Sequence, residues 1–484
     1  DADGNEVTYR PGMDISVLHA DPRYQPIHKS NKATPYTFAS GGTLFGHYYQ
    51  RSQTAEIRFD ITSQVTNQHE VKVGGKFKND LMEFEDFTVQ RDTLTYLTPT
   101  ILSPESPAHD LYSKEPIQFS AYAQDKMEFA SMIINAGIRY DYFNSRSEYL
   151  PNTYAPLSDT AMAEPKNTFS PRLGISFPIT DEGILHFSYG HFYQLPPYNF
   201  LYINPTFEDN VAVPTFGNAN LNPEKTVTYE IGLQQQLTED LAFNVTGFYK
   251  DVRDLLALQQ IRVSSSFSYY TYVNQDYGNI QGITFSLTKR KMPGTLFGLS
   301  LDYTFQVAEG NEVNATAFFL DAASGRQSEK IPVPLAWDQQ HTLNGVISFG
   351  EDRNWLFTLV GNISTGLPYT PLIYDKQIYL ESNSERKPLQ TNVDLLIEKS
   401  FDLSDIVLTA FLKVYNLFDT KNENFVYDDT GRATYTLQSG RSGPEATNEL
   451  AATNPGIKSA DEYFVRPQYY SSPREVRLGF MMEF

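Results

Sequence analysis

Apolar side chains recur at every second residue along much of the chain. The pattern is clear in residues 295–308 and again in residues 473–484. In the second segment, one side of an extended chain would carry Val476, Leu478, Phe480, Met482 and Phe484. The opposite side would carry mostly polar residues. Because the side chains of a β-strand point alternately to its two faces, each segment predicts a strand with one apolar and one polar face.

This alternation predicts fifteen strands. They lie near residues 47–65, 69–89, 115–128, 131–146, 168–179, 183–194, 225–237, 240–254, 276–290, 295–308, 338–350, 353–366, 388–401, 405–420 and 473–484. Short connections fall near 66–68, 129–130, 180–182, 238–239, 291–294, 351–352 and 402–404, and long ones near 90–114, 147–167, 195–224, 255–275, 309–337, 367–387 and 421–472. All long loops would then lie at one end of the sheet. That asymmetry is typical of outer-membrane barrels and has no reason in a soluble sandwich.

Composition fits an all-β, antiparallel transmembrane barrel. Aromatic residues make up 14% of the 484 residues, and aromatic rings form belts at both membrane interfaces of such barrels. A large secreted β-rich protein would be equally aromatic, so the argument depends on the loop asymmetry. The sequence has no run of eighteen or more apolar residues, which leaves no candidate for a transmembrane helix.

Charge and cysteine content exclude some functions. The net charge is −20, which argues against a nucleic-acid partner, because such binding needs basic patches. The chain has no cysteine, so disulfides and thiol catalysis are excluded.

The strand count indicates an incomplete barrel. Antiparallel bacterial barrels normally have an even number of strands, and fifteen is odd. If the last strand ends in the periplasm, the first begins outside the cell. The polar residues 1–46, with Pro11-Gly12 and Gly41-Gly42, are then expected to be the remnant of an extracellular loop. Residues 47–484 would form the partial barrel, and this chain would carry no plug domain.

Several motifs resemble the family of TonB-dependent outer-membrane receptors. Residues 170–177 followed by 186–196 are similar to a mid-barrel hairpin of that family, and residues 217–225 resemble the entry to its next strand. Trp337–Asn344 and Val414–Asp419 look like later strand segments. The terminal strand follows in the expected order, and Phe480, Met482 and Phe484 resemble the barrel-assembly signal of outer-membrane proteins.

The resemblance implies a barrel of about 22 strands with an N-terminal plug. This chain would supply about 15 C-terminal strands of it, beginning at the family's eighth. The plug, the energy-coupling box and about seven strands would then belong to a second chain or to another part of a longer protein. An open barrel cannot sit in outer-membrane lipid, because unpaired backbone groups there cost several kcal/mol each.

The implied function is TonB-dependent active import across the bacterial outer membrane. This chain would form most of the barrel wall and the extracellular loops that capture the ligand. The plug would connect it to the TonB-type energy-coupling complex, and a surface lipoprotein is a further implied partner. An iron-siderophore, cobalamin, a glycan and a peptide all remain open as ligands. The alternative is a passive porin or a structural outer-membrane barrel, which predicts an open lumen and no plug.

Aromatic residues in the long loops are the candidate ligand contacts, because they offer large contact areas and tyrosine adds a polar group. The candidates are Tyr198, Phe200, Tyr202, Phe267, Tyr269, Tyr270, Tyr272, Phe318, Phe319 and Tyr369. Packing of loop on loop, or a place in the outer aromatic belt, is the competing interpretation. Phe187, Tyr189, Tyr229, Tyr249 and Tyr303 are expected on strand faces instead.

No enzyme, cofactor or metal is predicted. The sequence has no G-x-S-x-G, H-E-x-x-H or P-loop motif, which also argues against an outer-membrane hydrolase. His186 and His191 lie five residues apart on one predicted strand, so their side chains point to opposite faces. The acidic pairs Asp428-Asp429 and Asp461-Glu462 could contribute to a calcium site, but calcium needs several converging oxygens and a solvated face is the simpler interpretation.

Overall fold

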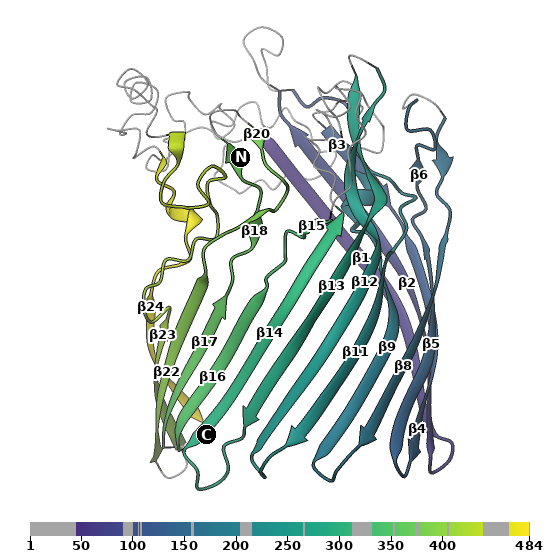
Figure 1. Cartoon of the computed structure of the whole chain (residues 1–484). Coiled ribbons are helices and arrows are strands. Elements are labelled where there is room, and N and C mark those ends of the chain that lie inside the picture. The colour runs from purple at the N-terminus through teal and green to yellow at the C-terminus, as the bar shows by residue number, and fades with distance from the viewer. Residues whose placement is uncertain are drawn as a thin grey trace, which may run out of the picture.

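The computed structural model shows tilted strands that form one curved wall (Figure 1). It describes residues 45–90, 100–104, 106, 109–155, 159–203, 215–264, 267–311, 332–351, 354–373, 378–403, 406–438 and 464–483. Longer connections gather at one end of the wall, and tight turns close the other end, near which the last strand finishes (Figure 1). The predicted asymmetry between the two ends is therefore confirmed.

Fifteen long strands correspond one to one with the predicted strands. They are β1 (Gly46–Gln64), β2 (His69–Thr88), β4 (Ile117–Phe129), β5 (Met132–Asn144), β8 (Lys166–Pro178), β9 (Gly183–Gln194), β11 (Glu224–Gln236), β12 (Leu241–Arg262), β13 (Ser268–Lys289), β14 (Phe297–Asn311), β16 (His341–Glu351), β17 (Trp355–Ser364), β22 (Gln390–Leu403), β23 (Ile406–Tyr415) and β24 (Glu475–Glu483). Each pairs antiparallel with the next in this order.

The remaining elements are short. β3 (His109–Lys114), β10 (Thr215–Phe216) and β15 (Pro332–Pro334) complete the 18-stranded main sheet. Three two-stranded ribbons are formed by β6 (Glu148–Tyr149) with β7 (Ala161–Met162), β18 (Pro368–Tyr369) with β21 (Glu385–Arg386), and β19 (Leu372–Ile373) with β20 (Ile378–Tyr379). Helix α2 (Tyr198–Tyr202) and the 3-10 helix η4 (Pro467–Tyr469) lie in connections. Among the described residues, no helix has the length and apolar character needed to cross a membrane.

The outermost long strands are edges of the sheet. β1 pairs with β2, and β24 pairs with β23. Within the described part of the chain, β1 and β24 do not pair with each other. The wall is therefore a barrel segment with two unpaired edges.

The two faces of the wall have opposite character. On β1, Ile57, Phe59 and Ile61 are exposed on one face, and their neighbours Arg58 and Asp60 lie on the other. The register carries the same division across the sheet, since residues paired across strands share a face. The apolar face is the one that meets lipid in a transmembrane barrel, and the polar face lines the lumen.

One predicted loop is wrong. Residues 255–275 were expected to be a long connection, but β12 and β13 extend into them and pair from Leu255 to Arg262. The register shifts between Val252 and Leu255, and Asp254 adopts a positive φ of 59°. This β-bulge changes the phase of the apolar alternation, so the periodic pattern stops at 254 although the strand continues.

Candidate lumenal site and loop clusters

Many lumenal charges are neutralised by a residue on their own strand. Residues two apart on a strand share a face, and six ion pairs on the lumenal face use this spacing. They are Arg58–Asp60, Glu70–Lys72, Lys78–Asp80, Lys126–Glu128, Arg139–Asp141 and Glu475–Arg477. The Arg139 guanidinium donates from both Nε and Nη2 to the Asp141 carboxylate, at 2.6 to 3.0 Å. These charges therefore do not depend on other parts of the molecule for a partner.

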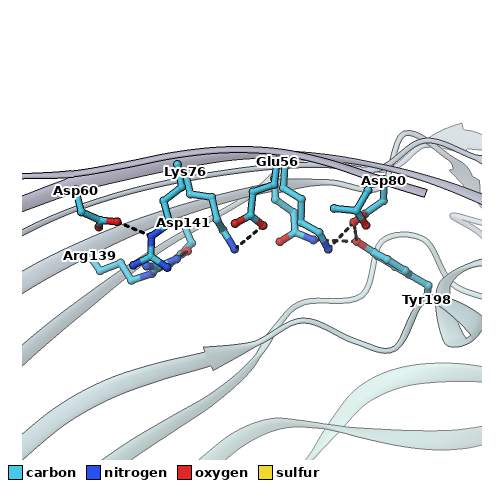
Figure 2. Close-up of polar contacts among 11 residues, drawn as sticks. Glu56, Asp60, Lys76, Asp80, Arg139, Asp141 and Tyr198 are labelled. Atoms are coloured by element: carbon cyan, nitrogen blue, oxygen red, sulfur yellow. Dashed lines mark hydrogen bonds and ion pairs between the residues drawn. The ribbon is translucent and has the colours of Figure 1, made fainter. Parts of the chain in front are cut away.

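Contacts between strands add further polar partners on the same face. The Tyr122 hydroxyl donates to Asp60 Oδ1 at 2.7 Å, and Lys76 Nζ lies 3.8 Å from Glu56 Oε2. Figure 2 shows the labelled acidic and basic groups lying along one side of the strands, with Tyr198 reaching them from a connection.

Helix α2 is anchored on this lumenal face. The Tyr198 hydroxyl donates to Asp80 Oδ2 at 2.7 Å and accepts from Gln118 Nε2 at 2.8 Å. Asp80 is only 1% exposed and also accepts from Thr54 Oγ1 at 2.6 Å. Burial and the Asp80 carboxylate raise the pKa of Tyr198. The connection after β9 thus folds inward and binds to β4 and β2, which lie three and four strands away from β9 in the sheet.

An aromatic cluster forms where α2 meets the wall. Tyr202 is 1% exposed, and its hydroxyl donates to the Ser145 carbonyl at 2.9 Å. It packs with Tyr112, Phe143, Leu201 and Leu221. Phe200 stacks on Tyr272, with ring centroids 4.2 Å apart. These contacts join α2 to β3 and β5 on one side and to β13 on the other.

The segment resembling a strand entry, residues 217–225, holds this connection in place. Asn218 Nδ2 donates to the Tyr272 carbonyl at 2.9 Å, and Asn220 Oδ1 accepts from Lys166 Nζ at 2.7 Å. A Cβ on Gly217 would lie 2.8 Å from the Leu201 carbonyl group, so the close approach to α2 requires glycine. Glu224 Oε1 accepts from the Leu256 amide at 3.0 Å. The motif therefore has a clear structural role.

A second cluster joins two connections to the upper end of the β12–β13 hairpin. Tyr269 is 1% exposed and packs with Leu150, Phe216 and Ile261. Phe267 is partly buried against this cluster. β10 pairs in parallel with β13 through Thr215 and Phe216. The upper end of the β12–β13 hairpin is therefore packed against neighbouring connections.

A third cluster lies in the connection between β23 and β24. The carboxylate of Glu423 accepts from Arg432 Nη2 at 2.6 Å and from the Ala433 amide. Burial opposes ionisation, but Arg432 and that amide outweigh it and lower the pKa of Glu423. Burial and the neighbouring Asp429 raise the pKa of Asp428.

Asp429 of the acidic pair in this connection finds protein partners. Asp429 Oδ2 accepts from Thr436 Oγ1 at 2.7 Å and from the Leu437 amide at 2.9 Å. In the described ranges, no group of three or more acidic, histidine or cysteine side chains is arranged to hold a metal ion. Asp461-Glu462 lies outside the described residues.

The segment 337–344 also has a structural role. Asp338 is 1% exposed, and its Oδ1 accepts from the Ala308 amide at 2.9 Å. Arg386 donates to the Asp338 carboxylate and, at 2.7 Å, to its carbonyl. One buried aspartate thus joins β14 to the connection that holds β21.

The structure separates the candidate aromatic residues into different environments. Tyr198, Phe200, Tyr202 and Tyr272 meet at α2, whereas Tyr269 belongs to the second cluster and Tyr270 is half-buried on β13. Tyr369 lies on β18, beside Gly431. Phe318 and Phe319 fall outside the described residues. Tyr269, Tyr270 and Tyr272 lie on strand β13 and not in a loop, because β12 and β13 continue to pair beyond the β-bulge.

The expected strand-face residues point as predicted. Phe187, Tyr189, Tyr229, Tyr249 and Tyr303 all lie within long strands. Tyr189 and Tyr229 rings pack 5.1 Å apart on the lipid face. Phe480 and Met482 are exposed on the same face of β24, at 69% and 53%, and Phe484 lies outside the described residues.

The lumenal residues Asp80, Lys166 and Phe143 were not among the predicted site residues. Asp80 has a signal in the sequence, because Lys78 is a charged residue two positions away on an alternating strand and must share its polar face. Which connection would fold onto them has no comparable signal, because α2 and Asp80 are separated by 118 residues.

Comparison with known proteins gives a family match and structural neighbours. Residues 3–417 match the family model described as TonB dependent receptor-like, beta-barrel. A search of curated proteins gave no match.

The structural neighbours are similar in fold at low sequence identity. The outer membrane transporter YddB from Escherichia coli has a TM-score of 0.56 at 14% identity, covering 77% of this chain and 51% of YddB. The unliganded ferric citrate transporter FecA has a TM-score of 0.54 at 14% identity, covering 90% and 54%. The FrpB iron transporter from Neisseria meningitidis has a TM-score of 0.53 at 14% identity, covering 78% and 53%. The chain spans about half the length of these structures.

Proposed function

The chain belongs to the family of TonB-dependent receptors, and from that premise we propose that it forms most of the wall of an active importer in the bacterial outer membrane. The proposal rests on the two faces of the wall. Apolar side chains are exposed on the lipid face, and ion pairs lie on the lumenal face. An inward-folded connection bearing aromatic side chains lies over that wall. A polar solute passing through the barrel would meet matched polar groups.

We propose that ligand contacts come from the accessible aromatic residues at the mouth. Tyr198, Phe200 and Tyr272 are only partly buried, and Tyr270 and Tyr369 are half-buried. Tyr202 and Tyr269 are each 1% exposed, so they support the connections and do not offer a surface to a ligand. The role of Phe318 and Phe319 stays a prediction.

The proposed further strands rest on the two unpaired edges, and the proposed plug and partners rest on the family. We propose that residues 47–484 are a barrel segment, that residues 1–46 belong to an extracellular loop, and that further strands and a plug close the barrel. These would lie on the same protein or on a separate chain. Outer-membrane lipid would surround the wall, and a TonB-type complex would act on the plug. A surface lipoprotein is a further proposed partner.

The intact mass of the native protein tests this organisation. The protein is purified from outer membranes, and tryptic mapping identifies any polypeptide that accompanies it. A mass well above 55.0 kDa, the mass of this chain, or a tightly bound partner with a plug supports the proposal. A single species of that mass that folds alone in detergent would contradict it.

Energy dependence separates the importer from the passive alternative. Cells with and without the protein are compared for depletion of small solutes from the medium, each in the presence and absence of functional TonB. An importer removes its solute only when both are present. Depletion that needs the protein but not TonB would favour a porin.

A further inference from the structure

A cavity of about 160 Å³ lies in the lumenal wall below α2. Lys76, Arg139 and Lys166 line it from three different strands, and Asp141 is the acid among the lining residues. The cross-strand register places Lys76 and Asp141 on one rung, and Lys166 on the next. The lining therefore carries three positive charges and one negative charge, within a chain whose net charge is −20.

The positive charges of Lys76, Arg139 and Lys166 differ in the polar groups that lie next to them. Arg139 is paired with Asp141 on its own strand. Lys166 donates to a neutral amide oxygen, Asn220 Oδ1, and Glu164 is the acid whose charge acts on it. Lys76 approaches Glu56 at 3.8 Å, a longer distance than the neighbouring Lys78–Asp80 pair at 2.8 Å. Lys76 and Lys166 thus lack the close carboxylate contact that Lys78 and Arg139 make beside them.

Apolar groups form the upper rim. Phe143, Leu195 and Pro223 line the cavity beside the lysines. Phe143 is 4% exposed and belongs to the cluster under α2, with Leu195 packed against it. This combination of cations and apolar rim suits an anion attached to an apolar or aromatic body, because the two parts of such a solute meet matching surfaces.

We propose that this cavity binds a carboxylate or phosphate group of the transported solute, with Lys76 and Lys166 as its cationic contacts. The cavity lies near the upper ends of β5 and β8, so the site would act after capture at the mouth. The assignment of the anion to a transported solute rests on the proposed import function. Binding itself does not, because it can be measured without import.

Matched probes test the site in the whole protein purified from outer membranes. Benzoate and phenyl phosphate supply the two anions on an aromatic body, and benzamide supplies the same shape as benzoate without charge. Isothermal titration calorimetry is expected to show benzamide binding about tenfold or more weakly than the better anion, the loss expected for a charge-assisted contact. The better of the two anions identifies the headgroup. Binding should weaken as salt is raised.

Variants locate the site. Lys166→Gln and Lys76→Gln should each lower affinity for the better anion about tenfold, and Lys166→Arg should retain most of it. Lys76→Gln serves as the independent test, because Lys76 does not contact the segment 217–225 that Lys166 helps to hold. Lys413→Gln removes another lumenal lysine, on β23, and should leave affinity unchanged.

Three results would overturn the proposal. They are failure of both anions to bind, equal affinity for benzoate and benzamide, and unchanged binding of the better anion in Lys76→Gln. If the native protein binds the anion but cells that carry it show no TonB-dependent uptake, the import function is contradicted and the binding site is not.

Discussion

Single charged residues in this wall are placed by strand periodicity. Asp80 makes three polar contacts from one position: it accepts hydrogen bonds from Thr54 and Tyr198 and forms an ion pair with Lys78. A buried carboxylate is tolerated only when it is paired and hydrogen-bonded. The first residue of α2, Tyr198, is therefore held by Asp80, whose negative charge is balanced by Lys78 on the same strand.

Removing the Tyr198 hydroxyl should loosen α2 and leave the barrel wall intact. Tyr198→Phe keeps the ring but deletes the hydrogen bonds to Asp80 and Gln118. A lost hydrogen bond to a charged group costs about 1.5–3 kcal/mol, so amide exchange of residues 198–203 should accelerate by roughly 10- to 100-fold. Hydrogen exchange read by mass spectrometry measures this. Tyr189→Phe, on the lipid face, is the matched control, and unchanged exchange in Tyr198→Phe would show that α2 is held by apolar packing alone.

The Glu423–Arg432 pair should make its connection sensitive to acid. Because the folded-state pKa of Glu423 lies below the ordinary glutamate value, the pair contributes fully above that ordinary value and is lost as the pH falls through the folded pKa. Protection of the Ala433 amide should therefore decline in that acidic range. Hydrogen exchange, corrected for the intrinsic effect of pH, measures it.

The control is Glu423→Gln, which keeps the shape and removes the titration. This variant should show weaker protection with little pH dependence. If it keeps the same acid response as the native protein, another group controls the connection.

At the scale of elements, lipid-facing and lumenal positions of one strand should respond differently to charge. Ile231 on β11 is 57% exposed on the lipid face, and an arginine near the bilayer midplane costs about 2–4 kcal/mol. Ile231→Arg should therefore lower the free energy of unfolding measured in lipid vesicles. Gln234→Arg, on the lumenal face of the same strand, should have little effect. Equal destabilisation by both variants would contradict the assignment of faces.

The long strands were predictable because alternation is a local property. Residues 183–194 were predicted as a strand and form β9 with the same bounds. The upper β12–β13 hairpin was not, because the bulge at Asp254 changes the face on which apolar residues appear. Strand 405–420 ends early, at Tyr415, since Asn416 takes a positive φ of 51° and its side chain bonds to the Thr420 backbone.

The candidate site was less predictable than the strands. Loop aromatics are visible in the sequence, but burial decides their role, and Tyr202 and Tyr269 are enclosed by residues far away in the chain. The contact of Tyr198 with Asp80 joins the connection after β9 to an early strand. Local patterns carry no information about such long-range packing.

For the whole molecule, the end with long connections should face the outside of the cell. The chain has no cysteine, so single cysteines can be placed without interference. Tyr154→Cys, in the exposed connection between β5 and β8, should react with a membrane-impermeant maleimide on intact cells. Asp181→Cys, in the tight turn between β8 and β9, should react only after the outer membrane is permeabilised. The reverse pattern would invert the orientation.

The pairing of lumenal charges within single strands has an electrical consequence. Each such pair presents a dipole and not an isolated charge, and the potential of a dipole falls off faster with distance than that of a single ion. A charged solute moving past these pairs would therefore cross a nearly flat potential, and an anion would be held at the cavity beside Lys76 and Lys166 instead. Along the paired stretches, the rate of passage would depend on steric obstruction, whereas escape from the wall would matter only at that cavity.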